Sequence, residues 1–163
     1  MTATGAPRLS VVIVTPDAFA AIRRTVECLA RQSALGALEL VVVAPSLAAL
    51  DADEALLAAF PRVVRVACGP VGSIGPANAA GVRHASAPIV ALAEDHAFPD
   101  PEWAERLIAA HDGPWAAVGP SVRNANPASA CRHDHGAGCP GLARASRHSR
   151  TRRTAGISGE PAT

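Results

Sequence analysis

Short apolar runs recur along the first 120 residues, and each has the length of a β-strand. The pattern predicts strands over residues 9–14, 40–43, 63–67, 88–93 and 115–118. The first run, LSVVIV, is apolar at nearly every position rather than at alternate positions. Because strands of this kind are buried on both faces, they indicate a parallel sheet covered by helices.

The segments between the runs carry apolar residues three or four positions apart, as amphipathic helices do. Ile22, Val26 and Leu29 show this spacing in the first segment. Residues that favour a helix start precede four predicted helices: Asp17, then Asp51 or Asp53, then Gly75 with Pro76, and finally Asp100 with Pro101. Strand and helix therefore alternate along the chain.

This alternation predicts an α/β fold class, with an open, mostly parallel sheet and helices on both faces. Ligands bind to such sheets beyond the carboxyl ends of the strands. The segments expected at those ends are residues 15–17, 44–46, 67–73 and 94–99. Only the last of them holds a cluster of chemically versatile side chains.

That cluster is Glu94, Asp95 and His96, directly after the run PIVALA. Two carboxylates and an imidazole offer oxygen ligands and one nitrogen ligand, a set that suits Mg²⁺ or Mn²⁺ bridging a diphosphate. The same residues are also compatible with a solvated turn in which Asp95 caps a backbone group. The pattern alone leaves both interpretations open.

The net charge of +1 hides an uneven distribution along the 163 residues. Residues 1–130 contain nine Arg and twelve acidic residues, whereas residues 131–163 contain six Arg and two acidic residues. Large aliphatic side chains in the final stretch are too few to offset the entropy of ordering it. We therefore predict a folded domain over residues 1–130 and a disordered, Arg-rich tail over residues 131–163.

The tail also contains four potential zinc ligands within nine residues: Cys131, His133, His135 and Cys139. Their spacing is compressed relative to zinc-finger sites, so we interpret them as an accidental cluster. The tail arginines have no stacking aromatic residues among them, and we expect no nucleic-acid partner. No apolar run approaches the ~18–20 residues of a membrane span, so we expect a cytoplasmic protein with no transmembrane segment.

Five segments follow one another in a recognisable order: SVVIVTP at 10–16, RQS at 31–33, ELVVV at 39–43, GPANAAGVRHA at 75–85 and FPDPEWAERL at 98–107. This order resembles the nucleotide-sugar-binding half of family 2 glycosyltransferases, which have the GT-A fold. The resemblance covers roughly residues 9–127. The order of the segments is more specific than any one of them.

The resemblance implies transfer, with inversion, of a sugar from a nucleotide-diphospho-sugar donor to the hydroxyl of an unidentified acceptor. It implies a divalent cation, Mn²⁺ or Mg²⁺, held by Asp95, with Glu94 and His96 as further ligands or supporting groups. It also places the donor against six positions of this chain: Thr15, Pro16, Asp17, Ala44, Asn78 and Arg83.

Several positions depart from the family pattern. Residues 44–45 are Ala-Pro, where the family usually has an acidic pair that contacts the nucleoside. Residues 78–79 are Asn-Ala, where an Arg-Asn pair usually lies near the diphosphate, and Arg83 is a candidate substitute for the missing cation. Ala93 replaces the first aspartate of the metal motif.

The family's catalytic base lies in an acceptor-binding half that normally begins after a segment such as GPSVRNANPASA. This chain instead changes at Cys131 into the Arg-rich tail. We therefore assign no catalytic residue and hypothesise a truncated transferase. Two alternatives stay open: a noncatalytic α/β domain that binds a nucleotide or a partner, and an unrelated doubly wound domain in which residues 94–96 only cap a turn.

Overall fold

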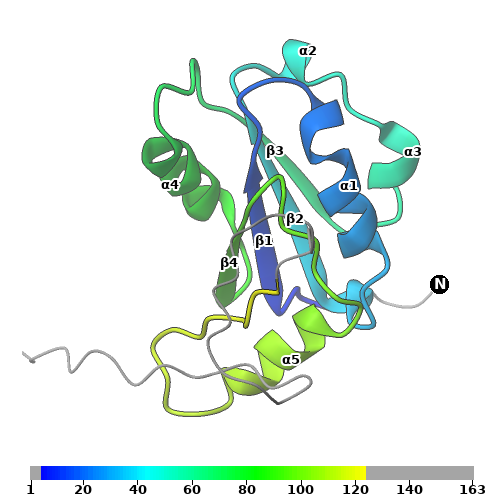
Figure 1. Ribbon diagram of the computed structural model, residues 1–163, viewed down its shortest axis with the longest axis vertical. Helices are drawn as coiled ribbons and strands as arrows, with labels where there is room; N and C mark the ends of the chain where they lie inside the picture. Colours follow the sequence, from blue (N-terminus) through cyan, green and yellow to red (C-terminus); the bar gives the residue numbers. More distant parts are fainter. Residues whose placement is uncertain (1–4, 124–163) are drawn as a thin grey trace, which may run out of the picture.

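Figure 1 shows a sheet with helices on both faces, and the computed structural model describes residues 5–123 of the chain. Within that part, all strands are parallel and their order is β3-β2-β1-β4. The strands are β1 (Leu9–Val14), β2 (Leu38–Ala44), β3 (Val63–Ala67) and β4 (Ile89–Ala93). Every residue of β1 and β2 is buried, which explains why their sequences are apolar on both faces.

Each strand is joined to the next by a connection that contains helix. Over residues 5–123 the connecting helices are α1 (Phe19–Ala30), α2 (Leu47–Leu50), α3 (Glu54–Leu57) and α4 (Ile74–His84), with a single 3₁₀ turn η1 (Leu35–Ala37) before β2. Helix α5 (Trp103–Ala110) follows β4. Helix α4 covers one face of the sheet, and α1, α3 and α5 lie on the other (Figure 1).

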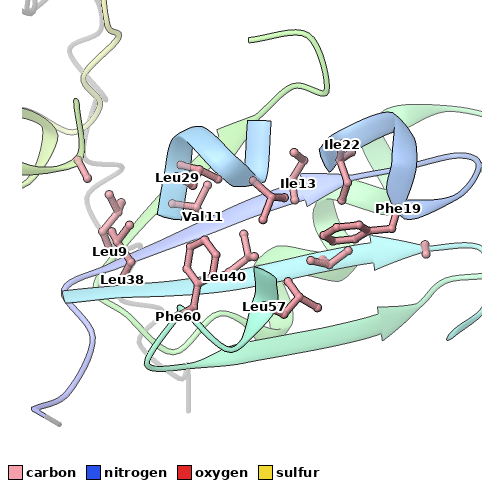
Figure 2. Packing of buried hydrophobic residues seen from close by; sticks show 14 of the residues in the cluster. Leu9, Val11, Ile13, Phe19, Ile22, Leu29, Leu38, Leu40, Leu57 and Phe60 are labelled. Atoms are coloured by element: carbon pink, nitrogen blue, oxygen red, sulfur yellow. The ribbon is translucent and has the colours of Figure 1, made fainter. Parts of the chain in front are cut away.

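Two apolar cores lie on opposite faces of the sheet. Leu9, Val11 and Ile13 of β1 pack with α1 in one core. Phe19 and Phe60 belong to the same core (Figure 2). The alternate residues of β1 point toward α4, where they pack with alternate residues of β2 and with small residues of the helix. The period of two along a strand thus divides one apolar run between two cores.

A buried carboxylate ties the amino ends of the strands together. Glu39 of β2 is fully buried and accepts hydrogen bonds from Ser10 Oγ at 2.5 Å and from the backbone N–H and hydroxyl of Ser86 at 2.7 and 2.8 Å. Arg62 Nε lies 2.6 Å from the same carboxylate. Burial raises the pKa of Glu39, but these donors outweigh burial, and the net pKa is below its usual value.

The predicted α/β fold class, with its open parallel sheet and helices on both faces, is confirmed. Asp53 caps α3, because its Oδ1 accepts the Leu56 N–H at 3.0 Å. The other two predicted aspartate starts are wrong. Helix α1 begins after Ala18 rather than on an Asp17 cap, and Asp100 bonds Arg123 while α5 begins at Trp103.

The predicted fifth strand over residues 115–118 is also wrong, since the structure has no strand there. The run is only four residues long and lies between Gly113-Pro114 and Gly119-Pro120. Proline has no N–H to donate to a sheet, and glycine weakens an extended segment. The run is apolar, but it is too short, and the residues on either side of it are too unfavourable, for a strand to form.

Several predictions fall on residues that the structure does not describe. The Arg-rich tail over 131–163, its four cysteine and histidine residues and the domain boundary at residue 130 lie outside the described residues. Over residues 5–123, none of the helices has the length and apolar character required to cross a membrane.

Candidate functional site

The sheet order defines where a ligand is expected. The chain adds β2 and then β3 on one side of β1. It then crosses back and adds β4 on the other side of β1. The order therefore reverses between β1 and β4. In open α/β sheets, ligands bind at this reversal, beyond the carboxyl ends of the two strands. Residues 15–17 and 94–96 follow those two strand ends.

The loop after β1 is fixed by its own hydrogen bonds. Thr15 is buried, its N–H donates to Val43 O at 2.9 Å, and its hydroxyl donates to Ala18 O at 3.0 Å. Pro16 and Asp17, in contrast, are exposed. Thr15 thus shapes the loop, and the two following residues offer the surface that a ligand can contact.

The turn after β4 holds a cluster of acidic and imidazole groups. His96 Nδ1 lies 2.6 Å from Asp95 Oδ1, and His96 Nε2 lies 3.2 Å from Glu94 Oε2. The hydrogen bond to Asp95, followed by the charges of Asp95 and Glu94, raises the pKa of His96. The imidazole is therefore held between two carboxylates on an exposed surface.

This arrangement limits how the turn can bind a metal. The two ring nitrogens of His96 face different carboxylates, so the three side chains do not converge on one point. Throughout residues 5–123, no group of three His, Cys, Asp or Glu side chains is placed to hold a metal ion. Mg²⁺ and similar ions commonly use one or two carboxylates together with substrate phosphates. Asp95 fits this mode of binding, in which substrate phosphates supply further ligands. The arrangement of the turn does not fit a metal site whose ligands all come from protein side chains.

The other predicted donor positions are spread over two elements. Ala44 is fully buried at the end of β2, and its carbonyl accepts the Cys68 N–H at 3.0 Å. It therefore presents no side chain to a ligand. Asn78 and Arg83 both lie on α4, which starts at the carboxyl edge of the sheet and runs toward the amino edge.

Asn78 and Arg83 face different surroundings. A cleft of about 600 Å³ lies beside β3, and its lining includes Pro76, Ala80, Arg83 and His84 of α4 but not Asn78. At 100° per residue, Asn78 projects from the opposite side of the helix, away from β3. Arg83 therefore lines the cleft beside β3, whereas Asn78 lies on the other side of α4 and outside that cleft.

Two side chains that were not candidates from the sequence bind the segment after β4: Thr25 on α1 and Gln32, just after the end of that helix. The Thr25 hydroxyl donates to Asp95 O at 2.8 Å, and Gln32 bonds the backbone of residues 100 and 104. Both side chains are buried. Gln32 belongs to the RQS segment, and the available signal for Thr25 was a polar residue within the apolar face of a predicted helix.

A protein-family model matches most of the chain. The model of the family described as "Glycosyl transferase family 2" matches residues 10–156. No curated protein sequence matches the chain significantly.

Among solved structures, S. aureus TarS aligns at 17% identity and a TM-score of 0.48, over 64% of this chain and 20% of TarS. TarS 1–349 aligns at 19% identity and 0.47, and TarS 1–349 in complex with UDP at 20% and 0.48. Both of these alignments cover 64% of this chain and 33% of that chain. The chain therefore spans a third or less of the length of these proteins.

Proposed function

Because the chain belongs to glycosyl transferase family 2, we propose that it binds a nucleoside diphospho-sugar and transfers the sugar, with inversion, to an acceptor hydroxyl. The observation that carries this proposal is the placement of the acidic turn at 94–96 beside the loop at 15–17. The two segments flank the point where the strand order reverses. Open α/β sheets bind nucleotides at that point.

The donor side of the site uses three parts of the chain. The exposed residues Pro16 and Asp17 form one wall, and Asn78 on α4 forms another. Asp95 supplies carboxylate oxygens for a divalent cation, Mn²⁺ or Mg²⁺, shared with the diphosphate. Such a cation, when bound, offsets the negative charge that develops on the departing diphosphate. Glu94 and His96 adjust the charge around Asp95.

The acceptor side is assigned no residue. Inverting transfer requires a base that accepts the proton of the attacking hydroxyl. All the residues that we assign lie at the donor side of the sheet. We further propose that the donor-binding domain extends over residues 1–130. The match to the family continues beyond that boundary, to residue 156.

Asp95→Asn tests the donor site directly. The change keeps the size of the side chain but removes its negative charge. We expect affinity for Mn²⁺ in the presence of UDP, GDP or ADP, tested in turn by calorimetry, to fall at least about tenfold. Asp112→Asn is the matched control, because Asp112 is exposed and lies after α5, beside Arg8 at the amino end of β1 and away from the carboxyl ends of the strands. Equal affinity in Asp95→Asn and wild type contradicts the proposed site.

A second function is favoured by one observation. Ala44 and Ala93 present small apolar side chains at strand ends, where the family usually has acidic residues. A protein that binds a nucleotide without turning it over needs fewer charged groups than a transferase. Radiolabelled nucleotide sugars distinguish the two functions. Mn²⁺-dependent binding without release of nucleoside diphosphate supports the binding protein, whereas sugar transfer or hydrolysis supports the enzyme.

A further inference from the structure

The segment after β4 lies alongside α1, and side chains of α1 contact its first half at two points. Thr25 Oγ1 donates a hydrogen bond to the backbone carbonyl of Asp95 at 2.8 Å. The Arg24 guanidinium lies over the ring of Phe98, with its carbon 4.0 Å from the ring centroid. Adjacent residues of one helix thus hold both the acidic turn and the residues that follow it.

The second half of the same segment is attached to the end of α1. Gln32 Nε2 donates to Asp100 O at 2.8 Å, and Gln32 Oε1 accepts the Ala104 N–H at 2.9 Å. The Ser33 N–H donates to Pro101 O at 2.8 Å. Residues 24–25 thus contact the segment at 95–98, and residues 32–33 contact it at 100–104. Helix α1 and the residues directly after it therefore hold residues 95–104, which we call the strap.

Most of these interactions are made to the backbone of the strap. A buried hydroxyl or amide that lacks a partner is costly, so Thr25 and Gln32 favour the one path of the strap that satisfies them. Thr25 is fully buried and Gln32 is 4% exposed. Because α1 is itself packed on the sheet through Ile22, Val26 and Leu29, the path is fixed relative to β1.

We propose that Thr25 is a positioning residue for Asp95. By holding the Asp95 carbonyl, the Thr25 hydroxyl fixes the Asp95 backbone and hence the direction of its carboxylate at the β1–β4 reversal. Helix α1 begins directly after the loop at 15–18, so the same helix sets the distance between both walls of the donor site. The link to cation binding rests on the function proposed above, whereas the hold on the backbone does not.

Thr25→Val tests the proposal, because valine keeps the shape and the branching of threonine but has no hydroxyl. Amide hydrogen exchange at Ala97, whose N–H donates to Glu94 O at 3.2 Å within the turn, measures the hold in the full chain without any ligand. We expect exchange about fivefold to tenfold faster in Thr25→Val, the factor expected for one hydrogen bond. Thr25→Ser restores the hydroxyl and should restore slow exchange. Ser33→Ala is the matched control, because that hydroxyl bonds Glu105 instead of the turn.

Titration of Mn²⁺, with and without UDP, followed by electron paramagnetic resonance, measures the effect on Asp95. We expect Thr25→Val to bind Mn²⁺ about fivefold to tenfold more weakly and Thr25→Ser to bind as wild type does. In an Asp95→Asn background, Thr25→Val should cause no further loss. A further loss of the same size in that background overturns the positioning role, because Thr25 then acts independently of Asp95.

The outcomes separate this proposal from the proposed function. If wild type binds no Mn²⁺, the proposed cation site fails, and hydrogen exchange alone decides whether Thr25 holds the turn. Unchanged exchange in Thr25→Val overturns the hold on the backbone. Faster exchange with unchanged Mn²⁺ affinity overturns the positioning of Asp95. Faster exchange with weaker Mn²⁺ binding, both restored in Thr25→Ser, supports the proposal.

Discussion

Glu39 shows how a charged residue can be accommodated within a strand that is otherwise apolar. Its carboxylate is buried, but it receives hydrogen bonds from Ser10 and Ser86 and an ion pair from Arg62. Ser86 lies in the connection between α4 and β4. Glu39 therefore attaches the start of β4, the strand that leads into the acidic turn, to β1 and β2 at the amino edge of the sheet.

Glu39→Gln should destabilise the fold, because the amide N–H₂ cannot accept the hydrogen bonds that the carboxylate accepts. We expect a loss of roughly 2–3 kcal/mol in the free energy of unfolding at pH 7, measured by urea denaturation. Glu54→Gln is the control: Glu54 pairs with Arg65 on the surface, where such a pair contributes little. Similar losses in the two variants would show that burial of Glu39 is unimportant.

The pH dependence of stability provides a second test of Glu39. Its pKa is lowered in the folded state, so its contribution is complete above the unfolded-state pKa of about 4.3. That contribution is lost as the pH falls through the lower folded-state pKa. Urea denaturation at a series of pH values should show wild type losing more stability under acid than Glu39→Gln. Parallel pH profiles would contradict this assignment.

At the scale of elements, the approach of α4 to the sheet depends on Gly81. A Cβ atom at this position would lie 2.4 Å from Val12 Cγ1 and 2.9 Å from Val43 Cγ2. Gly81→Ala should therefore destabilise the protein by roughly 1–3 kcal/mol, even though alanine favours a helix. Gly75→Ala, in the first turn of the same helix with nothing within 4 Å, is the control and should be nearly neutral. Chemical denaturation measures both variants.

The sheet was predictable from sequence because its determinants are local. A parallel strand that is buried on both faces must be apolar throughout, so the sequence alone predicts the strands at 9–14 and 40–43. The error at 115–118 has a local cause as well, since four apolar residues between Gly-Pro pairs resemble a strand in composition alone. Helix starts were harder to predict, because Asp17 and Asp53 look alike in sequence and only Asp53 caps a helix.

The candidate site was predictable only in part. Residues 94–96 stood out because acidic side chains follow an apolar strand. Thr25 and Gln32 could not be connected to that turn, because their partners lie about 70 positions away along the chain. The side of α4 on which Asn78 and Arg83 lie depends on how the helix packs on the sheet. Contacts distant in sequence therefore determine the parts of the site that the pattern did not predict.

At the scale of the whole molecule, the two candidate positions on α4 test where the nucleotide binds. Arg83 lies five residues, about 7.5 Å of helix, beyond Asn78 and further from the carboxyl edge of the sheet. It lines the cleft beside β3. If the donor binds at the β1–β4 reversal, Asn78→Ala should weaken Mn²⁺-dependent binding of UDP, GDP or ADP about fivefold, the loss expected for one hydrogen bond.

Arg83→Ala should leave that affinity within about twofold of wild type. Calorimetry on the two variants gives a contrast that does not depend on turnover, and thermal denaturation checks that both remain folded. The opposite result, with a loss in Arg83→Ala and none in Asn78→Ala, would move the nucleotide into the cleft beside β3. In that case Arg83 would supply the positive charge for the diphosphate, and Asp95 would lie at the wrong side of α4 to share a cation with it.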